Sequence, residues 1–193
     1  MSLNIYHISH PIIQILSTYI SNQRNNDKFS YEYYYRYTGF LLIYETLRKY
    51  IKLEAIYIKQ LYSVKNLNVL NPKNKYLICT NISQTYHIIT DIKSIVPNIK
   101  ILNINYKDNK NIKNSIDEMK ISLKDTKIFI VEKKTNDENI LNLIQYLKDE
   151  KHISLSNINL TSIFINHQTL NKLGSKYPEL KVYTTKIIYN NKK

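Results

Sequence analysis

From residue 75 onward, the spacing of hydrophobic and polar positions predicts strands that alternate with helices. Residues 128–131 form a short apolar run rich in β-branched side chains, which is typical of a central parallel strand buried on both faces. Apolar residues then recur at helical spacing over 140–147, and Thr135 with Glu138 has the spacing of a capping box. This strand, its polar turn and the following helix form the predicted centre of the domain.

The same alternation extends to both sides of this unit. A polar turn at 81–84 leads into a helix that Pro97 ends, and a further helical turn is expected near 169–175. Residues 107–113 are rich in Asn and Lys, which predicts a solvated, mobile loop. Further strands are predicted at 76–80, 100–106, 158–166 and 181–188. The order of these segments predicts an α/β fold, with a parallel sheet flanked by helices.

The first 70 residues follow a different pattern. Two stretches with helical spacing, 12–20 and 28–51, predict helices, and Asp27 is a candidate cap of the second. Residues 53–70 contain two alternating stretches around a polar turn, which favours a small β-arm of two strands. We therefore expect one domain over residues 1–193, with N-terminal helices at 10–51, a β-arm at about 53–70 and an α/β core at 75–188.

Composition and charge narrow the classes of partner. Hydrophobic residues make up 43% of the 193 residues, which suffices for a folded core. The formal net charge of +13 would suit a nucleic acid, an anionic membrane face or an acidic protein. Lysine supplies nearly all of this charge, and only Arg24, Arg36 and Arg48 carry the guanidinium group that reads bases and phosphates best. A specific nucleic-acid site is therefore not favoured, and the abundance of Lys, Asn, Ile and Tyr is typical of an AT-rich coding sequence.

The cluster YEYYYRY at residues 31–37 admits two interpretations. Aromatic rings interleaved with a cation can form a platform on which single-stranded nucleic acid stacks. The same rings at helical spacing can pack in a core while their hydroxyl groups reach the surface. Core packing is favoured, and nucleic-acid binding stays open as an alternative function.

Other chemically active residues give weak signals. Cys79 is the only cysteine and has no neighbouring His or carboxylate, so we interpret it as a core residue in a reducing compartment. The five histidines show no metal-ligand spacing, and no metal or cofactor is expected. No apolar run approaches the roughly 20 residues that span a bilayer, so no transmembrane segment is expected.

Three segments follow one another in an order that a known family shares. They are HPIIQ at 10–14, TGFLLIYETLRKY at 38–50 and INHQTLNKLGSKYPELKVYTTKI at 165–187. By these segments the chain resembles the uracil phosphoribosyltransferases over almost its whole length. The resemblance implies a phosphoribosyltransferase-like fold and a homodimer or larger assembly. Within the second segment, the family's long-helix signature falls on Gly39, Leu41, Leu42, Tyr44 and Glu45.

Enzymes of that family join uracil to phosphoribosyl pyrophosphate, release pyrophosphate and usually use magnesium. Their phosphate loop is glycine-rich, whereas the matching residues 131–140 contain no glycine and keep only Val131 and an acidic residue. By the resemblance, the degenerate phosphoribosyl pyrophosphate loop comprises Glu132, Lys133, Lys134, Thr135, Asn136, Asp137 and Glu138. The degenerate pyrophosphate contacts fall on Ser83, Gln84, Tyr106 and Lys107. The family's C-terminal uracil-binding segment has no counterpart.

These departures favour a protein that keeps the fold without catalysis, with no catalytic residue and no cofactor. It would act as a structural or binding subunit of a larger assembly, whose protein partners present an anionic surface to the lysines. Similar AT-rich homologues occur in plastid genomes, so the resemblance implies a plastid location, with the cytoplasm as the alternative. The runner-up function is an active uracil phosphoribosyltransferase that requires Mg²⁺ and lines its remodelled pocket with Glu132, Lys133, Lys134 and Thr135.

Overall fold

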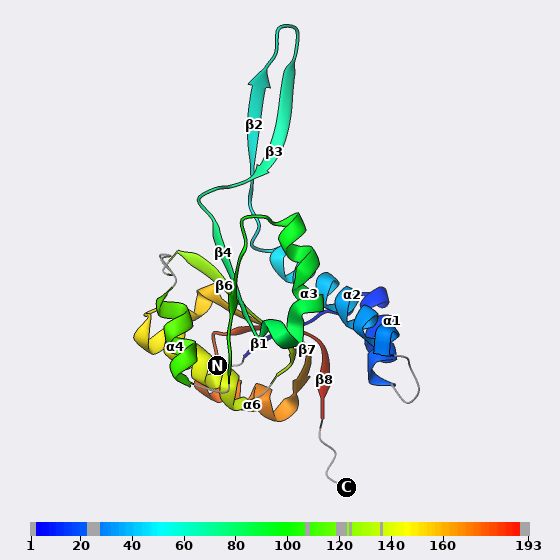
Figure 1. The fold of residues 1–193 in the computed structure, drawn as a ribbon, viewed down its shortest axis with the longest axis vertical. Helices are drawn as coiled ribbons and strands as arrows, with labels where there is room; N and C mark the ends of the chain where they lie inside the picture. Colours follow the sequence, from blue (N-terminus) through cyan, green and yellow to red (C-terminus); the bar gives the residue numbers. More distant parts are fainter. Residues whose placement is uncertain are drawn as a thin grey trace.

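The computed structural model describes residues 3–22, 28–106, 109–118, 123, 125–135 and 137–189. They form an α/β fold around a six-stranded sheet in which every neighbouring pair runs parallel, in the order β1-β8-β7-β6-β4-β5 (Figure 1). The strands are β1 (Asn4–His7), β4 (Lys75–Thr80), β5 (Lys100–Asn103), β6 (Thr126–Lys134), β7 (Ile158–Asn166) and β8 (Lys181–Ile188). The predicted parallel sheet flanked by helices is confirmed.

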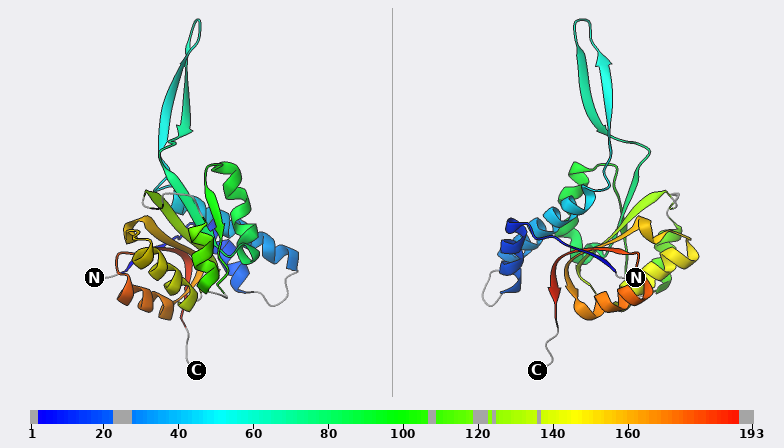
Figure 2. Two further views of the ribbon diagram at one scale, coloured as in Figure 1. Left: turned by 60° about the vertical axis from the view of Figure 1, so that its left-hand side comes forward. Right: turned by 180° about the vertical axis from the view of Figure 1, so that it is seen from behind.

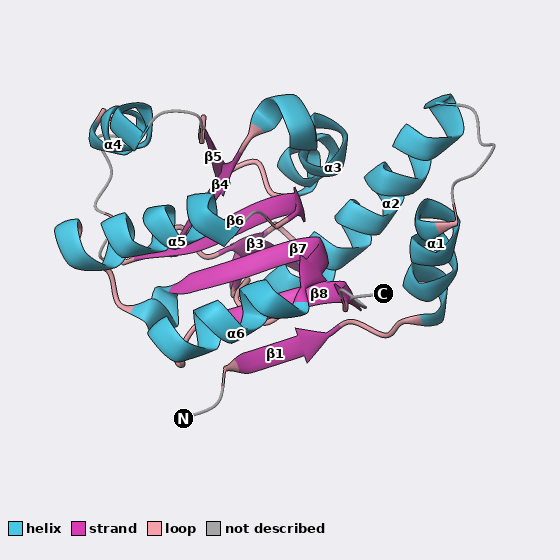
Figure 3. Ribbon diagram, turned by 90° about the horizontal axis from the view of Figure 1, so that it is seen from below, coloured by secondary structure: helices cyan, strands magenta, loops and turns pink. Residues whose placement is uncertain are grey.

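Helices cover both faces of this sheet (Figure 3). One face carries α1 (Pro11–Ser21), α2 (Lys28–Leu47) and α3 (Ile82–Ile95). The other face carries α4 (Asn109–Asp117), α5 (Asp137–Gln145) and α6 (His167–Lys176). A π-helical turn, η1 (Tyr146–Glu150), continues α5, and a 3-10 turn, η2 (Leu155–Asn157), precedes β7.

Strand β6 lies inside the sheet because its side chains suit both faces. Ile128 and Ile130 belong to the core under α5 and α6, whereas Phe129 and Val131 belong to the core under α2 and α3. All four are buried, so the predicted central strand is confirmed. Successive side chains of a strand point to opposite faces, so the alternation places residue 132 on the α5 side and residue 133 on the α2 side.

A two-stranded hairpin, β2 (Leu53–Lys59) and β3 (Val64–Leu70), projects from the rest of the molecule (Figures 1 and 2). Its strands pair antiparallel from Leu53 opposite Leu70 to Lys59 opposite Val64. The predicted β-arm is therefore confirmed. Its side chains are exposed along almost its whole length, because it packs on neither sheet face.

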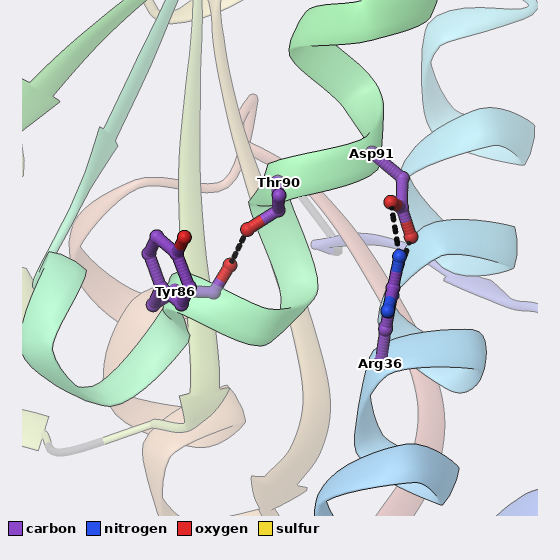
Figure 4. A network of polar contacts seen from close by, with 4 residues as sticks. All are labelled: Arg36, Tyr86, Thr90 and Asp91. Atoms are coloured by element: carbon purple, nitrogen blue, oxygen red, sulfur yellow. Dashed lines mark hydrogen bonds and ion pairs between the residues drawn. The ribbon is translucent and has the colours of Figure 1, made fainter.

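Helices α2 and α3 approach each other closely at a glycine. A Cβ atom at Gly39 would lie 2.3 Å from Ile88 Cγ2. The glycine of the signature segment therefore allows the two helices to pack this closely. At the surface of the same contact, Arg36 donates two hydrogen bonds to the Asp91 carboxylate, at 2.8 and 2.6 Å (Figure 4). The Arg36 hydrogen bond lowers the pKa of Asp91.

The tyrosine cluster of α2 divides between the core and the surface. Tyr35 is buried and its ring packs against Phe164 of β7, as the core interpretation predicts. Tyr33 and Tyr37 are exposed and pack against each other, with ring centroids 4.4 Å apart. The helix therefore uses one side of the cluster for packing and presents the other to solvent.

Helix α2 ends one turn earlier than the predicted residue 51. The amides of Tyr50 and Ile51 donate to the Leu47 carbonyl, and the Tyr50 hydroxyl donates to Asn159 Oδ1 at 2.6 Å. The i→i−3 bond of the Tyr50 amide tightens the turn that follows the helix. The candidate cap Asp27 lies outside the described residues.

Two elements are not predicted by the sequence pattern. β1 is a four-residue edge strand beside β8, too short to carry a periodicity of its own. α4 occupies much of the segment 107–113, where the prediction of a mobile loop is wrong. Its Ile112 and Ile116 lie one helical turn apart and are both buried, and this packing outweighs the polar composition around them.

Candidate functional site

The carboxyl ends of β4 and β6 form the natural ligand crevice of this sheet. β5 lies on one side of β4 and β6 on the other, so the chain reverses its direction of winding between β4 and β6. Open α/β sheets bind ligands outside the strand ends at such a switch point. The degenerate loop that starts at Glu132 and the segment that contains Ser83 both lie beside this crevice.

Glu132 is the acidic residue of that loop, and it is only 5% exposed. The Tyr106 hydroxyl donates a hydrogen bond to Glu132 Oε1. Burial raises the pKa of Glu132 to about 7, and the Tyr106 hydrogen bond opposes this rise. Burial also raises the pKa of Tyr106, with the Glu132 charge as the next cause, so the phenol stays protonated. The structure thus joins two predicted site residues to each other.

Lys133 lies on the opposite face of β6 and contacts tyrosine rings of α2. Its Nζ atom is 3.6 Å from the centroid of the Tyr35 ring and 4.8 Å from that of Tyr31. The negative face of an aromatic ring attracts a cation at these distances. Burial lowers the pKa of Lys133, and the charge of Glu32 acts against this. The ammonium group is therefore held by contacts within the chain.

Two buried threonines connect the strands at the crevice. Thr80 Oγ1, at the end of β4, donates to the Val131 carbonyl at 2.6 Å and lies 2.6 Å from Thr85 Oγ1. These contacts join β4, α3 and β6 directly. Thr80 and Thr85 are not among the site residues predicted from the sequence. The available signal was a pair of hydroxyl residues, one ending an apolar strand and the other opening the next helix.

The predicted pyrophosphate contacts Ser83 and Gln84 lie in the first turn of α3. The polar turn predicted at 81–84 is wrong, because the helix already begins at Ile82. Ser83 Oγ donates to Asn81 Oδ1 at 2.5 Å, so its hydroxyl is held at the start of the helix.

A side chain from β5 caps this helix start. Asn103 Oδ1 accepts a hydrogen bond from the Ile82 amide at 3.0 Å. β5 ends at Asn103, so the strand predicted over 100–106 is too long. The chain then leaves the sheet, which lets Tyr106 reach Glu132.

The end of the loop crosses toward β7. The Thr135 amide donates to the Phe164 carbonyl at 3.2 Å. The Thr135 hydroxyl is buried and has no hydrogen-bond partner among the described residues, so the capping box predicted for it is wrong. Lys134, at the end of β6, is exposed.

The remaining predicted site residues are placed in part. Lys107 and Asn136 lie outside the described residues. Asp137 and Glu138 are the first two residues of α5. Two acidic residues therefore open the helix, where the resemblance places a threonine and the first glycine of the family's phosphate loop.

The described residues offer little to a metal ion. No group of three or more His, Cys, Asp or Glu side chains among them is arranged to hold one. Mg²⁺ requires ionised carboxylates or other hard oxygen ligands. Glu132 fits this requirement poorly, because burial raises its pKa to about 7 and the Tyr106 hydroxyl donates to one of its two carboxylate oxygens.

Cys79 is fully buried in β4, as the sequence analysis predicts. Burial raises the pKa of its thiol to about 12. The thiol therefore stays protonated at neutral pH and is a poor nucleophile.

A sequence profile described as uracil phosphoribosyltransferase matches residues 7–191. The chain belongs to the uracil phosphoribosyltransferase family. The resemblance seen in its three segments is thereby confirmed, and it spans nearly the whole chain.

Two curated relatives are similar over most of their length. A uracil phosphoribosyltransferase homolog from Pyropia yezoensis is 27% identical over 191 residues, which cover 98% of this chain and 91% of the relative. A uracil phosphoribosyltransferase homolog from Porphyra purpurea is 27% identical over 188 residues, which cover 97% and 89%.

A solved structure, that of the AQ2163 protein from Aquifex aeolicus, shares the fold. It superposes with a TM-score of 0.68 at 18% identity and covers 96% of this chain and 88% of its own. At this identity the likeness concerns the fold alone.

Proposed function

We propose that this member of the uracil phosphoribosyltransferase family has lost phosphoribosyl transfer and acts as a binding or structural subunit of a larger assembly. The observation that carries the proposal is the contact between Tyr106 and Glu132. The acidic residue of the loop is buried, about half protonated near pH 7 and hydrogen-bonded through Oε1 to a neighbouring side chain, which disfavours its use as a ligand for a ribose or a metal ion.

The residues at the start of α5 also argue against binding of a phosphate dianion. A helix N-terminus attracts phosphate through free backbone N–H groups and its dipole, and glycine lets the backbone approach closely. Here α5 opens with Asp137 and Glu138. Each acidic residue near a phosphate costs on the order of 1 kcal/mol in water, and more when partly buried. Lys133 does not offset this charge, because its ammonium group lies over the Tyr35 ring on the other face of β6.

The β-arm supports a role in assembly. Leu61 and Tyr62 at its tip are 87% and 94% exposed, and Tyr57 and Val64 beside them are also exposed. An isolated two-stranded hairpin is marginally stable in water, and contiguous exposed apolar side chains mark contact surfaces. The arm therefore fits against a protein partner, which can be a second subunit of the same chain.

The location that we propose is a plastid. Both curated relatives come from red algae, and the composition is that of an AT-rich coding sequence. None of the helices in the described part of the chain is long and apolar enough to cross a membrane. Recovery of the native protein in the plastid fraction of its source cells tests the location, and recovery in the cytosol alone contradicts it.

The loss of catalysis is tested by direct assay. Purified protein is mixed with radiolabelled uracil, phosphoribosyl pyrophosphate and Mg²⁺, and an active family enzyme is assayed in parallel at the same concentration. We expect no UMP above the enzyme-free blank even at high protein concentration. Formation of UMP that scales with protein concentration would establish the enzyme function instead.

The binding role is tested by what co-purifies with the native protein. We expect defined protein partners whose retention falls as salt rises, because the net charge of +13 attracts anionic surfaces and salt screens that attraction. Retention of single-stranded RNA at physiological salt would favour the nucleic-acid function. Partner binding of equal strength at low and high salt would contradict the electrostatic part of the proposal.

A further inference from the structure

Three lysines lie at the amino ends of β6 and β8, close to where the β-arm leaves the body of the protein. Lys127 is the second residue of β6, Lys181 is the first residue of β8, and Lys52 directly precedes β2. We call these three residues the lysine cluster. It lies at the end of the strands opposite the crevice, which is formed by the carboxyl ends of β4 and β6.

The ring of Tyr50 brings two of these lysines together. The Nζ atoms of Lys127 and Lys181 lie 6.0 and 5.6 Å from the centroid of this ring. The ring is fixed, because its hydroxyl donates to Asn159 Oδ1 at 2.6 Å and its edge packs against Phe129. Two ammonium groups are therefore positioned around one ring that other contacts hold in place.

The third lysine is held at the base of the arm. The Asn71 amide, directly after β3, donates to the Lys52 carbonyl at 3.0 Å and closes the hairpin there. Burial lowers the pKa of Lys127, and the charges of Lys181 and Lys52 lower it further. Lys127 is therefore close enough to both other lysines to be repelled by each of them.

No carboxylate in the described part of the chain forms an ion pair with this cluster. Lys127 and Lys181 are nevertheless half-buried, and Lys127 Nζ donates to the neutral Asn157 Oδ1. The acidic residues nearest to the cluster in sequence are all exposed: Glu54, Asp125 and Glu179. Half-buried like charges destabilise a folded chain unless an anion faces them. The cluster therefore suits an anion that another molecule supplies.

The surroundings of the cluster favour a protein as the source of that anion. Leu53, next to Lys52, is 63% exposed, and the exposed apolar side chains of the arm continue from it. Single-stranded nucleic acid needs a free ring on which to stack, whereas the Tyr50 ring packs within the chain. A second copy of this chain is less suited than an acidic protein, because its own net charge is +13.

We propose that the lysine cluster docks an acidic segment of a partner protein, with the carboxylates of that segment against Lys52, Lys127 and Lys181. The inference rests on the binding role proposed above, and it specifies the charge of the partner and the surface that receives it. Ion pairs with the segment offset the repulsion within the cluster, and the half-buried lysines are screened by solvent less than exposed ones.

A synthetic acidic peptide tests the site directly. A fluorophore-labelled peptide of six glutamates is titrated with the full chain at low salt, and the matching peptide of six glutamines is the neutral probe. Fluorescence anisotropy measures the binding. We expect the glutamate peptide to bind at least about tenfold more tightly than the glutamine peptide, and its affinity to fall as salt rises.

Two double variants locate the binding. Lys127→Gln with Lys181→Gln removes two charges at the amino ends of β6 and β8, whereas Lys134→Gln with Lys186→Gln removes two charges near the carboxyl ends of the same strands. Both variants lose the same net charge. We expect the first to weaken glutamate-peptide binding about fivefold or more, and the second to weaken it less than about twofold. Lys52→Gln, at an exposed residue, should weaken binding about twofold to threefold without affecting the fold.

Equal losses in the two double variants would overturn the proposal, because binding would then follow net charge alone. Tighter binding of a single-stranded uridine hexanucleotide than of the glutamate peptide, lost in the Lys127 and Lys181 double variant, would assign the cluster to nucleic acid instead. Both results refute a site for an acidic protein, whereas co-purification tests the assembly role separately.

Discussion

Glu132 carries a carboxyl group that the fold keeps away from water. In the unfolded chain its pKa returns to about 4.3. In the folded protein, burial raises that pKa to about 7, although the Tyr106 hydroxyl stabilises the carboxylate. The folded state therefore binds this proton more tightly than the unfolded state does.

The sign of the resulting pH dependence follows from that difference. The contribution of Glu132 to stability is complete below about pH 4.3 and is lost as pH rises toward 7. Glu132→Gln keeps an acceptor for the Tyr106 hydroxyl but cannot ionise. Its free energy of unfolding should therefore not show the fall of about 3 kcal/mol that we expect for the wild type as pH rises. Urea unfolding at pH 5 and pH 8 measures the change, with Glu54→Gln on the exposed β2 strand as the control. A Glu132→Gln variant with the same pH dependence as the wild type would contradict the buried, proton-binding role.

The sequence predicts which residues occupy the loop but not what they contact. Tyr106 follows β5, and β5 and β6 lie on either side of β4. Their meeting depends on the order of strands in the sheet, which no local pattern encodes. The same holds for Lys133, whose contact with Tyr35 requires α2 to lie over the end of β6. The resemblance to the family therefore identified these positions, and tertiary packing decides what their side chains contact.

At the scale of elements, Gly39 sets the distance between α2 and α3. Gly39→Ala places a methyl group 2.3 Å from Ile88 Cγ2, and the branched Ile88 side chain has little room to move. Overpacking lowers the free energy of unfolding by about 1–3 kcal/mol, and the higher helix propensity of alanine raises it by up to about 1 kcal/mol. We expect a net loss of about 1–2 kcal/mol, measured as a lower urea midpoint.

Gly174→Ala in α6 is the matched control for this variant. The added methyl group would lie 3.5 Å from Leu3 Cβ, which is ordinary van der Waals contact. Without a clash, the helix propensity of alanine should raise stability by about 0.5–1 kcal/mol. If both variants changed the urea midpoint in the same direction, the close packing of α2 on α3 would not be the cause.

The elements that the sequence pattern predicts are those with strong periodicity. The buried run of β6 and the paired alternating stretches of the arm are examples. β1 was not predicted because four residues are too few to show a period. α4 was not predicted because the Asn and Lys residues around the buried Ile112 and Ile116 give the segment a polar composition. In both cases contact with the sheet, rather than local preference, decides the structure.

For the molecule as a whole, the β-arm is the element whose side chains find the fewest contacts within a single subunit. Leu61→Ser with Tyr62→Ser removes the two apolar side chains at its tip, between the Gln60 and Ser63 backbone hydrogen bonds that close the turn. Because both side chains are almost fully exposed, the stability of the body should change by less than about 0.5 kcal/mol. Association, in contrast, should weaken, because burial of these side chains would drive it.

Light scattering during size exclusion and the melting temperature separate these two effects. We expect the wild-type chain to elute as an assembly and the double variant to shift toward the monomer mass with an unchanged melting temperature. Tyr86→Ser serves as the control, since it removes an exposed ring of α3 on the body of the protein. Equal masses for all three proteins would show that the arm tip makes no contact within the assembly, and a loss of mass in Tyr86→Ser alone would move the contact surface to α3.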